Sequence, residues 1–248
     1  MTQPLLEVTS VSKSFGGVEA NRNIDLSVPE GKIIGLIGPN GSGKTTLFNS
    51  IVGYHPVDNG SIRFQQKEIT QLLVPDIARL GLLRTFQQTR IYSGMTCLQN
   101  MQISAPDTTT GFKSLFAALP MDQMQKINEM LTFVGLHTKR DILAGELSFG
   151  QQKLLEFAMA LIASPKLLLL DEPTAGINPT LINGLIERLK IANQQLGITL
   201  LIIEHNMRVI MNLAEHIYCL AHGQILAQGT PQQIQSNPIV IDAYLGAS

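Results

Sequence analysis

One stretch decides the fold of this chain: Gly38-Pro39-Asn40-Gly41-Ser42-Gly43-Lys44-Thr45. An apolar run at 33–37 precedes it and predicts a buried strand, and residues 46–52 follow it with the pattern of a helix. Together the three pieces predict a phosphate-binding loop, because the glycines let successive backbone N–H groups face one anion at the positive end of the helix dipole. Lys44 can reach the β- and γ-phosphates of a nucleotide, and the Thr45 hydroxyl can ligate Mg²⁺. Together with Thr46, the next residue, the stretch therefore predicts a site that binds a nucleoside triphosphate.

Composition excludes several other classes of protein. The 248 residues are 44% hydrophobic and 15% charged, which suits one large α/β domain. The net charge is −1 without a basic tail, so we expect no strong electrostatic binding to nucleic acid or anionic lipid. The apolar runs are too short to span a bilayer, and the first residues lack a signal-peptide pattern. We therefore expect a cytosolic chain that does not itself cross a membrane, with Cys97 and Cys219 as buried reduced thiols.

The rest of the chain predicts a P-loop NTPase of the α/β class. Two β-rich runs near the N-terminus alternate as in an antiparallel sheet, and helical periodicity dominates between residues 88 and 164. Apolar strands and helices then alternate again, as in a parallel sheet. We expect one domain at 1–248: a mainly parallel core sheet and an antiparallel β subdomain from 1–87 and 165–248, and an inserted helical subdomain at 88–164.

Polar side chains stand at the ends of three predicted strands, where an open parallel sheet binds its ligands. Asp171 can bind the hydration shell of Mg²⁺, and Glu172 can accept a proton from the water that attacks the γ-phosphate. His205 can contact the γ-phosphate or position that water, and Gln87 can touch both metal and water. Each residue alone would be an ordinary polar strand end. Their coincidence with the glycine-rich loop favours a catalytic site.

A second anion site is predicted at Leu147-Ser148-Phe149-Gly150-Gln151-Gln152, which opens an amphipathic helix. Ser148 and Gly150 offer a hydroxyl and free N–H groups at a helix N-terminus. Alone, this pattern would be only a helix N-cap. Because the chain already has a phosphate loop, we interpret the second site as one that serves the nucleotide of another molecule. Two copies arranged head to tail would each close on the triphosphate of the other, and hydrolysis would release them.

These motifs, in this order and at these spacings, resemble an ATP-binding cassette of ABC transporters over essentially the whole chain. The resemblance implies that Phe15 stacks on adenine, that Lys44 binds phosphates, and that Thr45, Gln87 and, through water, Asp171 hold Mg²⁺. It implies Glu172 as the catalytic base, His205 as the γ-phosphate switch and Gln87 as a further catalytic residue. The contact with the partner's ATP falls to the signature residues Ser148, Phe149, Gly150 and Gln151.

Five local sequences resemble more narrowly the ATPases of branched-chain and hydrophobic amino-acid importers. They are 84–92, Met95-Thr96, 173–179, 203–207 and Ala243-Tyr244-Leu245-Gly246. Urea-importer ATPases are similar, and lipopolysaccharide-export ATPases share part of the pattern. Two positions depart from the general cassette: Phe149 replaces a glycine, and Asn178 replaces a common aspartate.

The resemblance implies an ATPase subunit that sits peripherally at the cytoplasmic face of the inner membrane. Its partners would be a second ATPase subunit (paralogue or self), two transmembrane permease subunits and, indirectly, a periplasmic solute-binding protein. Ile91, Tyr92, Met95 and Leu98 would form a groove for a permease helix, or equally would be subdomain core. A soluble ABC ATPase acting on nucleic acid or ribosomes is the alternative of another class, but such proteins usually carry two cassettes, a coiled-coil insertion or basic extensions. A regulatory module without turnover would not need Glu172 and His205.

Overall fold

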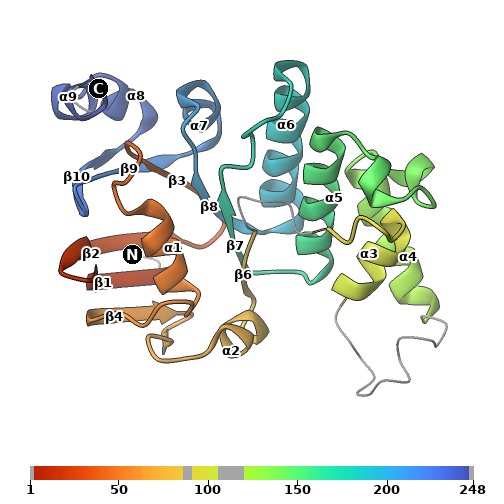
Figure 1. The fold of residues 1–248 in the computed structure, drawn as a ribbon, viewed down its shortest axis with the longest axis horizontal. Helices are drawn as coiled ribbons and strands as arrows, with labels where there is room; N and C mark the ends of the chain where they lie inside the picture. Colours follow the sequence, from red (N-terminus) through yellow and green to blue (C-terminus); the bar gives the residue numbers. More distant parts are fainter. Residues whose placement is uncertain (1–2, 86–90, 106–119, 246–248) are drawn as a thin grey trace.

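The computed structural model describes residues 3–85, 91–105 and 120–245. Among them, the strands form two sheets (Figure 1). One is a six-stranded sheet with the order β10-β9-β3-β8-β7-β6, parallel except for β10. Its strands are β3 (Ile33–Ile37), β6 (Leu82–Arg84), β7 (Leu167–Asp171), β8 (Thr199–Ile203), β9 (His216–Ala221) and β10 (Gln224–Gly229).

The other sheet is antiparallel, with the order β2-β1-β4-β5. Its strands are β1 (Pro4–Phe15), β2 (Val18–Pro29), β4 (Asn59–Phe64) and β5 (Lys67–Glu68). The predicted α/β fold, with a mainly parallel sheet and a separate antiparallel sheet, is confirmed.

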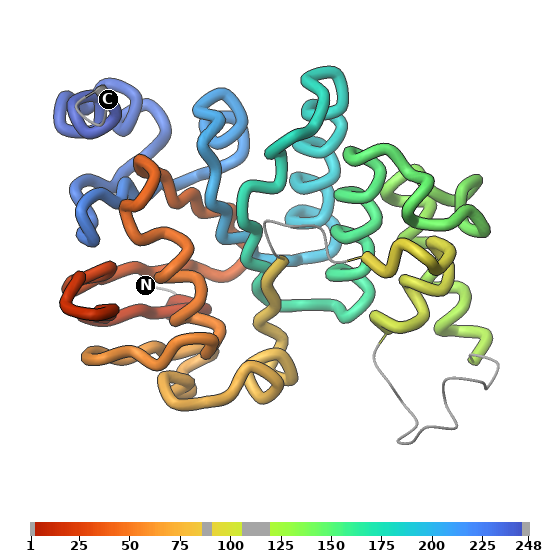
Figure 2. The backbone as a smooth tube through the Cα atoms, viewed as in Figure 1, coloured from red at the N-terminus to blue at the C-terminus, as the bar shows by residue number. Residues whose placement is uncertain are grey.

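The helices cover both faces of the six-stranded sheet and form a helical region at one end of the molecule (Figure 1). They are α1 (Lys44–Ile51), α2 (Val74–Arg79), α3 (Cys97–Ser104), α4 (Met121–Phe133), α5 (Phe149–Ile162), α6 (Pro179–Leu196), α7 (Met207–Leu213), α8 (Pro231–Gln235) and α9 (Pro238–Leu245). Short 3₁₀ turns, His137–Lys139 and Ala144–Glu146, lie between α4 and α5. The tube in Figure 2 shows α3, α4 and α5 grouped at the end opposite the antiparallel sheet. The exact subdomain boundaries stay a prediction.

Burial on two faces explains why the central strands are apolar throughout. In β7, Leu167 and Leu169 belong to a core that contains α1 and the antiparallel sheet, whereas Leu168 and Leu170 belong to a core formed with the helices on the other face. Side chains of a strand alternate between the faces of its sheet, so a strand buried on both faces needs an unbroken apolar run. Each such leucine contributes roughly 1.5–3 kcal/mol by leaving water.

The chain ends in a hairpin and two helices. Strands β9 and β10 pair across His222 and Gly223, as the sequence predicts, and α8 and α9 follow them. In Figure 1 these last helices lie above β9 and β10, at the end of the molecule that holds α1. None of the helices in the described ranges is both long and apolar enough to cross a membrane.

Candidate nucleotide site

The glycine-rich loop lies between β3 and α1 at the C-terminal edge of the six-stranded sheet. Gly43 stands at the N-cap of α1 with φ 105°, and a Cβ there would lie 2.2 Å from the carbonyl oxygen of Ala20. The position therefore tolerates no side chain. Among the described residues, the backbone N–H groups of Gly41, Gly43 and Lys44 donate no hydrogen bond. Free amides at the start of a helix form a cradle for phosphate oxygens.

Lys44 is held inside this loop by backbone carbonyls. Its Nζ donates to the carbonyl oxygens of Gly38 at 2.8 Å and Pro39 at 2.9 Å. Burial lowers the pKa of Lys44, and the nearby carboxylates of Glu172 and Asp171 oppose that shift. The ammonium group is thus placed over the loop, with both strand-end carboxylates within electrostatic reach.

Glu172 and His205 meet at the ends of the neighbouring strands β7 and β8. The distance from His205 Nε2 to Glu172 Oε1 is 2.5 Å. Glu172 has φ 50°, a left-handed conformation that costs a non-glycine residue about 1–3 kcal/mol and often marks a functional turn. Its backbone N–H donates to the carbonyl oxygen of Ile203 at 2.9 Å, which ties the turn to β8. The fold therefore joins two candidate catalytic side chains that lie 33 positions apart in sequence.

Asp171 is buried, and Arg84 on the adjacent strand β6 pairs with it. Arg84 NH2 lies 2.7 Å from Asp171 Oδ2, and the two side chains are 5% and 1% exposed. Arg84 also donates to Asn49 Oδ1 on α1, so one guanidinium joins the phosphate-loop helix to the end of β7. The other carboxylate oxygen, Asp171 Oδ1, is buried and has no hydrogen-bond partner among the described residues. An orphaned carboxylate oxygen next to a phosphate loop suits Mg²⁺ or its water.

Glu204 organises the turn after β7, a role that was not predicted from the sequence. Its carboxylate accepts hydrogen bonds from the Thr174 N–H at 2.9 Å, the Thr174 hydroxyl at 2.6 Å and the Asn206 N–H at 3.2 Å. Glu204 is only 2% exposed. Glu204 therefore ties the segment that follows Glu172 to the segment that follows His205. The sequence does carry a signal for this role, because Glu204 is a carboxylate directly after an all-apolar strand.

The signature loop stands at the start of α5. Ser148 caps the helix: its hydroxyl accepts from the Gln151 N–H, and the Gln151 side chain accepts from the Ser148 N–H. Phe149 is 46% exposed, and its ring lies against Gly176, where a Cβ would come within 2.8 Å of the ring. This aromatic substitution thus packs the signature loop onto the loop that follows β7. In Figure 1, α5 and α1 lie on opposite sides of β7 and β8.

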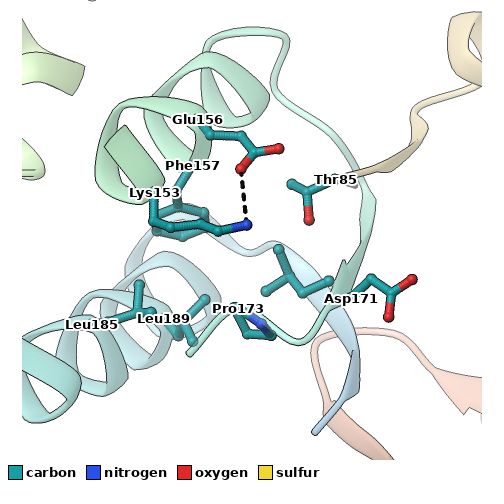
Figure 3. Close-up of a pocket in the computed structure, with 9 residues that line it drawn as sticks. Thr85, Lys153, Glu156, Phe157, Asp171, Pro173, Leu185 and Leu189 are labelled. Carbon is teal, nitrogen blue, oxygen red and sulfur yellow. Dashed lines mark ion pairs between the residues drawn. The ribbon is translucent and has the colours of Figure 1, made fainter. Parts of the chain in front are cut away.

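A small cavity, lined by both apolar and polar side chains, lies between α5, α6 and the end of β7 (Figure 3). Its volume is about 20 Å³, enough for one water molecule. Lys153 and Glu156 of α5 line one side as a buried ion pair at 3.5 Å, and Thr85 and Asp171 line the sheet side. Polar groups of the signature helix and of the nucleotide edge of the sheet therefore line the same cavity.

The remaining predicted residues lie at the rim or outside the described ranges. Phe15 ends β1, is 45% exposed, and contacts the His55 ring edge-on at 5.2 Å between ring centroids. The stacking of Phe15 on a base stays a prediction. Gln87 lies outside the described residues, so its predicted place remains a prediction. Cys97 and Cys219 are buried free thiols.

Comparisons with known proteins agree on one family. Residues 21–175 match the ABC transporter family, and residues 224–248 match the family described as branched-chain amino acid ATP-binding cassette transporter. Among solved structures, the chain is similar to a nucleotide-free ATP-binding cassette from an ABC transporter, with a TM-score of 0.87, 34% identity and coverage of 98% of this chain and 99% of that one. A structure of an ABC transporter cassette in its ADP conformation gives a TM-score of 0.88 at 35% identity, with coverage of 99% of this chain and 100% of that one.

Curated relatives are similar over nearly their whole length. The high-affinity branched-chain amino acid transport ATP-binding protein BraF of Pseudomonas aeruginosa is 37% identical over 253 residues, which covers 99% of each chain. The corresponding protein LivG of Escherichia coli is 36% identical with the same coverage. A probable LivG of Archaeoglobus fulgidus is 38% identical over 248 residues, covering 98% of this chain and 96% of the relative.

Proposed function

Because the chain belongs to the ABC transporter family, it is an ATP-binding and ATP-hydrolysing cassette, and we propose that it energises the import of branched-chain or other hydrophobic amino acids. The observation that carries the choice of solute is the match of residues 224–248 to the branched-chain family, together with relatives of that name that cover 99% of the chain. The free amides of the phosphate loop and the placement of Lys44 support nucleotide binding by the chain's own residues.

The geometry at the strand ends supports the catalytic roles that we propose. Glu172 accepts the proton of the water that attacks the γ-phosphate, and His205, 2.5 Å away, orients the Glu172 carboxylate and contacts the γ-phosphate. Lys44 binds the β- and γ-phosphates, and Phe15 stacks on the adenine ring. Attack by water breaks the bond between the β-bridging oxygen and the γ-phosphorus, which gives ADP and phosphate.

Mg²⁺ fits the donor set at this edge. Thr45, Asp171 and Gln87 are the residues that would hold it, and the unpartnered Asp171 Oδ1 is the observation that supports the assignment. The ion would neutralise charge on the phosphate oxygens when bound. Arg84 fixes the other oxygen of the same carboxylate and so sets its direction.

The placement of α5, the signature helix, and α1, the phosphate-loop helix, on opposite sides of β7 and β8 supports a head-to-tail dimer (Figure 1). In that dimer Ser148, Phe149, Gly150 and Gln151 contact the ATP held by the partner subunit, which is either a second copy or a paralogue. Nucleotide bound between the two subunits closes them, and hydrolysis releases them.

A short rigid segment near α3 is the proposed contact with the transmembrane permease. Asn100 is fully buried and bonds the backbone of Tyr92, Met95 and Thr96, so the loop is held by one side chain. Tyr92 is 54% exposed and Met95 36%, whereas Ile91 and Leu98 pack against the core. Two of the four predicted groove residues therefore remain available to a permease helix. Such docking places the subunit at the cytoplasmic face of the membrane.

Affinity purification of the tagged chain from detergent-solubilised membranes tests the proposal. We expect two polytopic subunits and a sister ATPase to co-purify, and mass spectrometry of a bound periplasmic protein to give a route to the solute. The matched control is a Tyr92→Asp, Met95→Asp variant, which should keep ATP turnover and lose the polytopic subunits. Recovery of ribosomal or nucleic-acid partners would contradict transport. Recovery of a urea permease or lipopolysaccharide-export proteins would contradict the solute.

A further inference from the structure

The C-terminal helix α9 reaches the phosphate loop through one hydroxyl group. The backbone N–H of Gly38 donates to Tyr244 Oη at 2.8 Å, across 206 positions of sequence. Tyr244 packs against the larger core, and burial raises its pKa to about 12, so the hydroxyl is neutral over the physiological range. This contact has no part in the catalytic roles assigned above.

Gly38 occupies a position where its N–H needs a partner. The parallel pairing of β3 with β9 ends at Ile37 opposite Cys219, so the next amide leaves the sheet. Gly38 is buried, and a Cβ there would lie 1.9 Å from the Leu220 carbonyl oxygen. A buried amide without a partner is costly, and the tight packing leaves little room for water to supply one. Tyr244 supplies the acceptor instead.

The same glycine also holds the phosphate-binding lysine. The Gly38 N–H is bound by Tyr244, and the Gly38 carbonyl accepts from Lys44 Nζ at 2.8 Å. The first residue of the loop therefore lies between a side chain of α9 and the ammonium group that binds phosphate. A rotation of the backbone at Gly38 would move the carbonyl oxygen that positions Lys44.

We propose that Tyr244 is a positioning residue of the nucleotide site, through which the C-terminal helix and nucleotide binding are thermodynamically linked. The hydroxyl fixes the first peptide of the phosphate loop in the orientation that presents Lys44. Linkage is reciprocal, so a nucleotide that tightens the loop also stabilises α9. The inference rests on nucleotide binding by this site and is independent of the transported solute.

Substituting Tyr244→Phe removes only the acceptor, and Tyr218→Phe is the matched control. The Tyr218 hydroxyl is also buried and also bonds a backbone, accepting from the Ser27 N–H at 3.1 Å and donating to the Ser27 carbonyl at 3.2 Å, on the antiparallel sheet. We expect Tyr244→Phe to weaken binding of a fluorescent ATP analogue about threefold to tenfold, the value of one hydrogen bond. The KM for ATP should rise in parallel, with kcat changed less than about twofold. Tyr218→Phe should bind within about twofold of wild type.

Equal affinities of the two variants would overturn the proposal, because a merely structural hydroxyl would affect both alike. Thermal unfolding of both variants checks that they fold. Hydrogen exchange on the wild-type chain is the second test and needs no variant. We expect the ATP analogue to slow exchange in residues 238–245, and protection of the phosphate loop without any change there would also overturn the proposal. Failure of wild type to bind nucleotide would instead contradict the proposed function itself.

Discussion

Arg84 is a buried cation that pairs with the Asp171 carboxylate at 2.7 Å. We expect Arg84→Gln to lower the free energy of unfolding by about 3 kcal/mol, because it leaves Asp171 buried without its ionic partner. The carboxylate also loses the group that sets its direction toward Mg²⁺. The Mg²⁺ concentration for half-maximal ATP turnover should therefore rise several-fold. Urea denaturation and a Mg²⁺ titration of ATPase activity measure the two effects.

Arg63→Gln is the control for that prediction. Arg63 pairs with Glu68 at 3.4 Å, with both side chains about half exposed, and a surface pair of this kind contributes about 0–1 kcal/mol. The control variant should leave stability and Mg²⁺ dependence close to wild type. If Arg84→Gln behaved like Arg63→Gln, the positioning role of Arg84 would be wrong.

Several residues of the site could be predicted from strand ends, but their partners could not. Glu172 and His205 follow apolar runs, and that pattern alone places both at one edge of the sheet. Arg84 was not predicted as part of the site, although a buried cation at the end of β6 needs an anion. The choice of Asp171 as that anion depends on β6 lying next to β7, an order of strands that no local pattern encodes. The roles of Phe15, Gln87 and the signature residues remain predictions from family resemblance.

At the scale of elements, three of the described helices, α3, α5 and α8, begin with a capping box, and only α5 lies at the proposed dimer contact. Ser148 with Gln151 opens α5, and Thr96 with Gln99 opens α3. Replacing either cap by alanine should cost about 1 kcal/mol of stability. We expect Ser148→Ala also to lower ATP turnover about tenfold or more, because its hydroxyl contacts the partner's ATP, whereas Thr96→Ala should keep turnover. Thermal unfolding and steady-state ATPase assays separate the two effects, and equal turnover in both variants would contradict the trans contact.

Most element positions could be predicted from periodicity, and the misses have a local cause. The run at 33–37 matches β3, since burial on both faces leaves unbroken apolar sequence. In contrast, β1 and β2 are twelve residues each, longer than the short runs that the sequence indicates. Ser10 and Asn23 adopt φ near 50°, and register shifts interrupt the pairing. Such bulges break the period-two pattern on which sequence reasoning depends.

At the scale of the whole molecule, two buried groups predict an alkaline limit to stability. Burial raises the pKa of Cys219 from 9.0 to about 11 and that of Tyr244 from 10.0 to about 12. The folded chain keeps these protons after the unfolded chain has released them, so rising pH favours unfolding. The contribution of the protonated Cys219 and Tyr244 side chains to the free energy of unfolding is therefore fully present below about pH 9 and declines as the pH rises toward 11. Urea denaturation between pH 8 and 11 should show this fall, and Cys219→Ala should make it shallower; equal slopes would contradict the assignment.

In the proposed closed dimer, the phosphate loop and Glu172 of one subunit act together with the signature loop of the other. Glutamine keeps the size of Glu172 but cannot accept a proton, so Glu172→Gln should lower ATP turnover at least about a hundredfold while leaving nucleotide binding intact. ATP would then persist between the phosphate loop of one subunit and Ser148 of the other. We expect the variant to elute as a dimer in ATP and as a monomer in ADP when analysed by gel filtration with light scattering.

Adding Ser148→Arg to Glu172→Gln supplies the matched control, because it places a bulky side chain in the proposed contact, with loss of the Ser148 cap costing about 1 kcal/mol of stability. That double variant should remain monomeric in ATP and still bind nucleotide. A folded Glu172→Gln variant that binds ATP and stays monomeric would rule out a dimer of two identical copies. The co-purified sister ATPase would then be the partner to mix with it, and dimerisation of that mixture only in ATP would establish that the shared nucleotide joins two different subunits.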